Sequence, residues 1–164
     1  MSDAVLQPRE PIDLLVVSGS AADLELTLLS LAQCELGGRL AVARDGEAAL
    51  ELLLGAGGPR DDGRPAGLPR LVLLDLELPK LDGFEVLQQL KANPRTRMIP
   101  VVVFTSDADE RDVVRCYQLG ANSCVAKPVA FDAFRETVAE LGRYWLRVSR
   151  PPFPAPGASP GRQG

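Results

Sequence analysis

LVLLDLELPKLDG, at residues 71–83, begins as an unbroken apolar run, reaches a carboxylate at Asp75 and then turns. A run of Leu and Val bounded by turn residues is typical of a strand that is buried on both faces, as in a parallel sheet. Asp75 then stands at the carboxyl edge of the strand, where open α/β sheets bind their ligands. Pro79 and the pair Asp82-Gly83 end the extended run and begin a new element. We therefore expect the chemistry of the protein at the end of this strand.

The size and composition of the chain indicate a single globular domain. Its 164 residues are enough for one hydrophobic core and too few for two ordinary domains, and 46% hydrophobic with 24% charged residues is an ordinary balance. No apolar run is long enough to cross a bilayer and the amino terminus has no signal-like core, so we expect a cytoplasmic protein without membrane contact. The net charge of -4 argues against a general affinity for nucleic acid, which needs clustered positive charge.

Histidine is absent from the chain, and this absence removes several classes of site. Histidine-based metal centres, Ser/His/Asp catalysis and a phosphohistidine on this chain are all excluded. The three cysteines, Cys34, Cys116 and Cys124, have an odd count and no CxxC spacing. They are therefore predicted to be small buried residues of a protein in a reducing compartment.

Hydrophobic periodicity predicts five strands that alternate with five helices. The predicted strands cover residues 13–17, 39–43, 71–74, 101–105 and 123–126, and the helices lie at about 24–36, 45–54, 84–92, 107–119 and 132–148. Gly37-Gly38 is expected to end the first helix, and the capping pair Asp107 and Glu110 to begin the fourth. This alternation implies right-handed crossovers and a doubly wound α/β fold, with a five-stranded parallel sheet in the flavodoxin-like order 2-1-3-4-5.

Three segments outside this pattern are rich in Pro, Gly or polar residues. Residues 1–11 are expected to form a flexible leader, and residues 149–164 a disordered or polyproline-like tail. Residues 55–69 predict a surface loop, which we interpret as an insertion without a function of its own. The folded domain is therefore expected to span residues 12–148.

Three polar side chains follow three neighbouring strands of the predicted sheet: Asp75 after the third, Thr105 at the end of the fourth and Lys127 after the fifth. Neighbouring parallel strands lie about 4.8 Å apart, so three strand ends can surround one small anion. A carboxylate can attack phosphorus as a nucleophile, while an ammonium and a hydroxyl hold the transferred oxygens. Each residue alone has an ordinary structural explanation, but the three together predict a phosphoryl site.

Over about residues 12–148, the chain resembles the receiver domain of bacterial two-component response regulators. The motifs that carry the resemblance are Leu73-Leu74-Asp75 with Pro79 and Asp82-Gly83, Pro100 five residues before Thr105, Leu119-Gly120-Ala121, and Lys127-Pro128. The resemblance implies that Asp75 accepts phosphate from the histidine of a sensor kinase. It also implies that Thr105 follows the phosphate and that Lys127 pairs with it.

A narrower resemblance is to the small regulators paired with phytochrome-type histidine kinases. The long loop before the third strand, Pro94 in an Asn-Pro break and the ending Tyr144-Trp145-Leu146 carry it. Those regulators form homodimers through the final helix and carboxyl-terminal arm. The resemblance therefore predicts a homodimer with Tyr144, Trp145 and Leu146 at its interface.

The sequence departs from the family at the end of the first strand, where typical receivers carry two acidic residues that help to hold Mg²⁺. Ser18 and Gly19 stand there in this chain. Mg²⁺ prefers carboxylates, waters and phosphate oxygens, so its binding is expected to be weak or absent, with Asp75 as the remaining carboxylate. Glu77 could compensate as a second metal ligand, or the backbone N–H groups of residues 18–20 could bind an anion instead.

A second departure is Cys124, which stands where the family has an aromatic switch residue and is too small to replace it. The acidic pair and the aromatic switch residue both serve the phosphorylation mechanism, and both are lost. The chain is therefore predicted to be an atypical single-domain response regulator, a pseudo-receiver that signals by protein association, with metal-assisted phosphorylation weakened or absent. One alternative is a phosphorylation-competent receiver that accepts phosphate on Asp75 from a sensor histidine kinase. Another is an aspartate-nucleophile phosphohydrolase, which is disfavoured because Glu77 replaces the second aspartate of that class. We therefore do not expect an enzyme.

Overall fold

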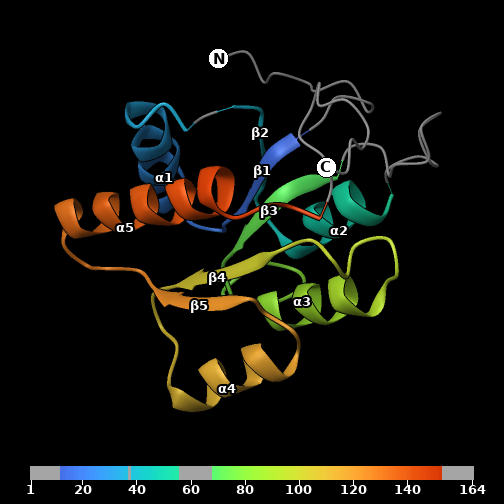
Figure 1. The fold of residues 1–164 in the computed structure, drawn as a ribbon. Coiled ribbons are helices and arrows are strands. Elements are labelled where there is room, and N and C mark those ends of the chain that lie inside the picture. Colours follow the sequence, from blue (N-terminus) through green and yellow to red (C-terminus); the bar gives the residue numbers. More distant parts are fainter. Residues whose placement is uncertain (1–11, 37, 56–67, 153–164) are drawn as a thin grey trace, which may run out of the picture.

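A computed structural model of the protein describes residues 12–36, 38–55 and 68–152. The expected leader, residues 56–67 of the expected loop and residues 153–164 of the expected tail lie outside this part. Figure 1 shows a central sheet with helices on both of its faces. All strand pairs are parallel and the strand order is β2-β1-β3-β4-β5. The expected doubly wound fold is therefore confirmed.

The described part of the chain alternates strands and helices from end to end. The strands are β1 (Ile12–Val17), β2 (Leu40–Ala43), β3 (Pro69–Leu74), β4 (Val101–Thr105) and β5 (Ser123–Ala126). The helices are α1 (Ala21–Gln33), α2 (Gly46–Leu54), α3 (Gly83–Ala92), α4 (Glu110–Gln118), α5 (Phe131–Arg143) and a π-helical segment η1 (Tyr144–Val148). Within these ranges no helix is both long and apolar enough to span a membrane.

Each face of the sheet has its own apolar core. On one face α1 packs against α5, and Leu71 of β3 and Val138 of α5 both belong to this core. On the other face α2 packs against α3, and Val72 of β3 and Leu87 of α3 both belong to that core. Successive side chains of a strand point to opposite faces, so the apolar run of β3 supplies both cores. This explains why the run has no polar residue before Asp75.

The start of α3 closes the end of β3. Asp82 caps α3 by accepting the N–H of Glu85 at 3.0 Å. The next residue, Gly83, lies so close to β3 that a Cβ there would be 2.3 Å from the carbonyl oxygen of Asp75 and 2.6 Å from Cα of Leu76. Only glycine fits this approach, so the Asp-Gly pair holds the segment that carries Asp75.

The first helix ends earlier than the sequence predicted. Gly37-Gly38 was expected to end it, but α1 stops at Gln33 and Cys34 is its C-cap. Glu35 adopts a left-handed conformation with φ 55°, and the N–H of Leu36 donates to the carbonyl of Leu31 at 3.0 Å. This is a Schellman ending in which glutamate stands where glycine is usual.

The fourth helix begins at a different capping pair from the predicted one. Asp109, not Asp107, is the N-cap, and its carboxylate accepts the N–H of Asp112 at 2.9 Å. The carboxylate of Asp112 accepts the N–H of Asp109 in return. The predicted pair of Asp107 and Glu110 is therefore wrong, because Glu110 is already the first helical residue.

The final helix changes character near its end. The sequence predicted one helix over 132–148, but α5 ends at Arg143 and continues as the π-helical segment η1. The N–H of Ser149 donates to the carbonyl of Tyr144 at 2.6 Å, which closes the wider turn. Trp145 and Leu146 are partly buried against the core that α1 and α5 share. Tyr144 and Val148 stay exposed.

Candidate functional site

The three predicted site residues meet at the carboxyl edge of the sheet. Asp75 follows β3, Thr105 is the last residue of β4, and Lys127 follows β5. Their backbones are tied to neighbouring strands: the N–H of Asp75 donates to the carbonyl of Val17, and that of Lys127 to the carbonyl of Thr105. All three side chains are buried. The structure therefore assembles the predicted group from strand ends that the sheet holds rigidly.

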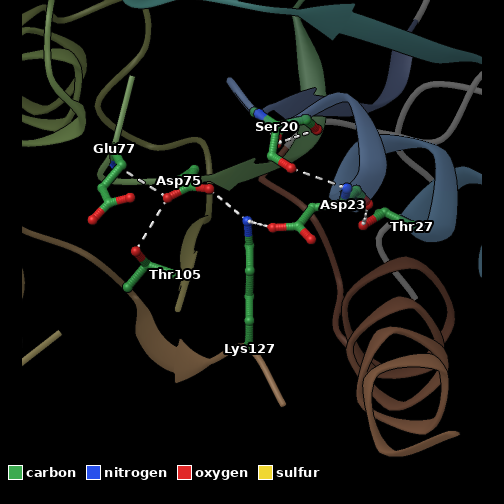
Figure 2. A network of polar contacts seen from close by, with 8 residues as sticks. Ser20, Asp23, Thr27, Asp75, Glu77, Thr105 and Lys127 are labelled. Atoms are coloured by element: carbon green, nitrogen blue, oxygen red, sulfur yellow. Dashed lines mark hydrogen bonds and ion pairs between the residues drawn. The ribbon is translucent and has the colours of Figure 1, made fainter. Parts of the chain in front are cut away.

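Both carboxylate oxygens of Asp75 accept hydrogen bonds (Figure 2). Oδ1 accepts the Thr105 hydroxyl at 3.1 Å and the backbone N–H of Glu77 at 3.1 Å. Oδ2 accepts the Lys127 ammonium at 2.5 Å, in a salt bridge whose two side chains are 8% and 5% exposed. Charge-assisted hydrogen bonds of this kind are the strong ones in proteins. Asp75 is thus held in one orientation by donors on both oxygens.

A fourth member of the group, Asp23, is not among the residues predicted from the sequence. It lies in the first turn of α1, and its Oδ2 accepts the Lys127 ammonium at 2.9 Å. Figure 2 shows Lys127 reaching between Asp75 and Asp23. An acidic residue one turn into the helix after β1 is the only signal that the sequence offers, because Asp23 and Lys127 are 104 residues apart.

The turn after β1 carries no carboxylate. Ser18 is buried, and it lines the same small void as Asp75 and Lys127. Its hydroxyl lies 3.3 Å from both the carbonyl and the N–H of Ser20, so it is used within the turn. At Gly19, a Cβ would lie 3.0 Å from Cδ of Pro79, which is a tight approach. The turn itself therefore adds no negative charge beside Asp75.

Comparison with known proteins identifies the family. The model of the response regulator receiver domain matches residues 15–139 of this chain. Those residues run from β1 to α5 and contain Asp75, Thr105 and Lys127. The chain belongs to the response regulator receiver family.

Two relatives match this receiver over most of their own length. The probable methanogenesis regulatory protein FilR2 of Methanothrix harundinacea is 42% identical over 155 residues, covering 94% of this chain and 96% of that protein. Response regulator Rcp1 of Synechocystis is 36% identical over 148 residues, covering 90% of this chain and 96% of Rcp1.

Two solved structures share the fold of this receiver. The Mn²⁺-bound form of Rcp1 superposes with a TM-score of 0.77 at 35% identity and covers 87% of this chain and 100% of that one. The phosphorylated cyanobacterial phytochrome response regulator RcpA superposes with a TM-score of 0.76 at 30% identity and covers 88% of this chain and 100% of that one. The receiver is thus related to phytochrome-associated regulators.

The residues of this receiver fit a divalent cation poorly. Two carboxylates reach the site: both oxygens of Asp75 already accept hydrogen bonds, and Asp23 is paired with Lys127. The ammonium of Lys127 lies between Asp75 and Asp23, where it already supplies positive charge. Among the described residues, no group of three or more His, Cys, Asp or Glu side chains could hold a metal. Hard cations such as Mg²⁺ need several oxygen ligands that are free to coordinate.

The sequence raised two ways to compensate for the missing acidic pair: Glu77 as a metal ligand, or the N–H groups of residues 18–20 as an anion site. Glu77 is exposed, and its N–H already donates to Asp75, on the side of Asp75 away from Lys127 in Figure 2. In the turn after β1, the N–H of Ser20 lies against the Ser18 hydroxyl, and the N–H of Asp23 donates to the Ser20 hydroxyl. These two N–H groups are therefore engaged within the turn.

Cys124 lies away from this polar group, against α4. Its N–H donates to the hydroxyl of Tyr117 at 3.3 Å, and it packs against the core cluster that contains Cys116. Burial, together with the neighbouring Cys124 thiol, raises the pKa of Cys116 to about 12, and burial also raises the pKa of Cys124. Both thiols are thus protonated near neutral pH and are poor nucleophiles and metal ligands. Cys124 packs as a small, partly buried side chain at the position where the sequence comparison with the family expects an aromatic residue.

Proposed function

We propose that this receiver is an atypical response regulator in which metal-assisted phosphorylation of Asp75 is weakened or absent and output depends on protein association. One observation carries the proposal: Asp75, Thr105 and Lys127 are assembled and buried, while Ser18 and Gly19 supply no carboxylate. The acceptor and its two partners are present, but residues 18 and 19 add no charge that would attract a dication.

The charges around Asp75 support this proposal. An incoming phosphoryl group is anionic, and it would approach Asp75 and Asp23 with the single ammonium of Lys127 as the neutralising charge. Two unit charges about 4 Å apart interact by about 1 kcal/mol in water and about 4 kcal/mol at an effective dielectric constant of 20. Without a bound cation, this repulsion raises the barrier to transfer.

The second candidate function is a phosphorylation-competent receiver, and the hydrogen bonds of Asp75 favour it. Thr105 and Lys127 bind different oxygens of the carboxylate, so a hydroxyl and an ammonium are both in reach of a group attached there. In that reaction a carboxylate oxygen forms a bond to phosphorus as the bond from phosphorus to the kinase histidine breaks, and the histidine nitrogen keeps the electron pair. A sensor histidine kinase would be the donor.

Acetyl phosphate separates the two functions without a kinase. With Mg²⁺ present, the intact mass of the wild-type chain is expected to show little or no added phosphoryl group, because the cation is held poorly. Asp75→Asn is the matched control, since it keeps the shape of the side chain and removes the nucleophile. A full gain of one phosphoryl group that disappears in Asp75→Asn would establish the phosphorylation-competent function instead.

The kinase partner is proposed from the relatives. Phytochrome response regulators are among the structures that this receiver resembles, so a phytochrome-type sensor histidine kinase is the partner we propose. A histidine kinase of any type would meet the same surface, the carboxyl edge of the sheet beside Asp75.

We also propose a homodimer through the final helix and arm, which the sequence placed at Tyr144, Trp145 and Leu146. Trp145 and Leu146 are partly buried within one chain, whereas Tyr144 is 52% exposed and Val148 68% exposed. Tyr144 stacks edge-on against Trp145, with ring centroids 5.1 Å apart. Exposed aromatic surface of this kind is typical of interfaces.

The dimer is tested by removing exposed apolar surface without touching the core. Tyr144→Ser combined with Val148→Ser is expected to give monomers in light scattering, because both side chains lie on the exposed side of η1. Leu29→Ser on α1 is the control, since Leu29 is 46% exposed and lies far from the arm in sequence. An intact chain that is already monomeric would exclude this interface.

A further inference from the structure

The ammonium of Lys127 is shared by two carboxylates from different elements. It lies 2.5 Å from Oδ2 of Asp75 and 2.9 Å from Oδ2 of Asp23. The Lys127 side chain is 5% exposed and that of Asp23 is 35% exposed, so Asp23 stands at the mouth of the site and Asp75 at its base. A buried lysine with two acidic partners can be drawn toward either one.

Asp23 is held in place by its own backbone. Its N–H donates to the hydroxyl of the helix cap Ser20 at 3.2 Å, and its carbonyl accepts the hydroxyl of Thr27 at 2.7 Å. Figure 2 shows both contacts at the start of α1, the helix that contains Asp23. The carboxylate therefore projects toward Lys127 from a fixed turn, and its contact with the ammonium is built into the fold.

The shared ammonium has a consequence for any phosphoryl group on Asp75. Such a group adds negative charge at Oδ2 or Oδ1 and needs Lys127 as its counter-ion. Asp23 opposes this in two ways, because it accepts the same ammonium and because its own negative charge repels the group. Neither effect requires a metal.

We propose that Asp23 is a positioning residue that competes with Asp75, and with a phosphoryl group on Asp75, for the ammonium of Lys127. The part that concerns the phosphoryl group rests on the proposed function; the ion pair itself does not. Asp23 thereby draws Lys127 toward the mouth of the site and lowers the affinity of Asp75 for anionic groups.

The ion pair is tested by nuclear magnetic resonance of lysine ammonium groups, without metal or phosphoryl ligand. The chain has three lysines, so assignment is simple. The Lys80 side chain is 58% exposed, so its ammonium is expected to exchange fast. Lys91 donates to the carbonyls of Arg97 and Ile99 and serves as an internal reference. We expect a protected Lys127 signal that shifts in Asp23→Asn and is lost or broadened in Asp23→Ala, with Lys91 unchanged.

The matched control is Glu25→Gln. Glu25 is an exposed acidic residue of the same helix, so this variant removes the same charge from α1 without a contact to Lys127. It is expected to leave the Lys127 signal in place. A wild-type chain without a protected Lys127 signal, or an Asp23→Asn spectrum equal to that of the wild type, would overturn the proposal.

The competition is tested with beryllofluoride and Mg²⁺ as the phosphoryl analogue, in chains that carry Ser18→Asp so that cation binding does not limit the titration. Asp23→Asn is expected to bind the analogue about three- to tenfold more tightly, between the effect of an exposed ion pair and that of a buried charged hydrogen bond. Glu25→Gln should leave the affinity unchanged. An equal or weaker affinity in Asp23→Asn contradicts the competition, as does an equal gain in Glu25→Gln.

Failure of the proposed function would give a different result from failure of the Asp23 proposal. It would appear as full modification of the wild-type chain by acetyl phosphate, which is measured without any change at Asp23. The Lys127 signal would still decide whether Asp23 holds the ammonium.

Discussion

Ser18→Asp is expected to make the phosphorylation of Asp75 strongly dependent on Mg²⁺. Ser18 lines the same void as Asp75 and Lys127, so a carboxylate there would enter the site and supply a second acidic ligand. Two unit charges about 4 Å apart interact by about 1 to 4 kcal/mol, depending on the local dielectric, and a doubly charged cation gains about twice as much. Because 1.4 kcal/mol is a factor of ten, Mg²⁺ affinity should rise about tenfold or more. The rate of acetyl phosphate labelling at limiting Mg²⁺ measures this gain.

Ser18→Asn is the control for the added side chain, because asparagine has the size of aspartate without its charge. It is expected to label as slowly as the wild type. Ser18 is preferable to Gly19 for this experiment, since a Cβ at Gly19 would also meet the carbonyl oxygen of Glu77 at 3.3 Å. Equal labelling of Ser18→Asp and Ser18→Asn would show that missing charge at this position is not what limits the reaction.

Gly83→Ala is expected to cost about 3 kcal/mol or more of the free energy of unfolding. The new Cβ would meet the carbonyl oxygen of Asp75 at 2.3 Å and Cα of Leu76 at 2.6 Å, and backbone atoms cannot rotate away. The N–H of Gly83 also donates to the carbonyl of Leu76, so α3 would have to retreat from β3. Urea unfolding measures the loss, and in a domain of this size it lowers the melting temperature by about 6 to 12 °C.

Gly142→Ala in α5 is the matched control. A Cβ there meets only the ends of two flexible side chains, Leu36 at 2.8 Å and Leu31 at 3.1 Å, which can shift. Alanine also favours the helix by up to about 1 kcal/mol, so the net change should stay within about 1 kcal/mol. If Gly83→Ala were as stable as Gly142→Ala, the close approach of α3 to the acceptor segment would not be required.

The fold and the three strand-end residues could be predicted because both follow from local patterns. The buried run before Asp75 and the alternation of strands and helices leave few topologies open. Once the order is fixed, Asp75, Thr105 and Lys127 fall at one edge of the sheet whatever the details of packing. The structure confirms the order and places the three side chains in contact.

The details that the sequence did not predict depend on tertiary contacts or on residues that carry no local signal. The run from Asp107 to Asp112 offers two overlapping capping pairs, and the structure uses Asp109 with Asp112. The left-handed residue that ends α1 is Glu35, which carries none of the signal of a glycine. Asp23 belongs to the site because it pairs with Lys127, which is 104 residues away in the sequence. Helical periodicity alone gives no sign of that contact.

Counting bound Mn²⁺ by electron paramagnetic resonance tests most directly whether this receiver has lost its cation site. At equimolar protein and metal, the wild-type chain is expected to leave the signal of free Mn²⁺ nearly unchanged, while Ser18→Asp reduces it. Stoichiometric binding by the wild type that disappears in Asp75→Asn would contradict the central claim, because Asp75 would then hold a cation without the missing acidic pair.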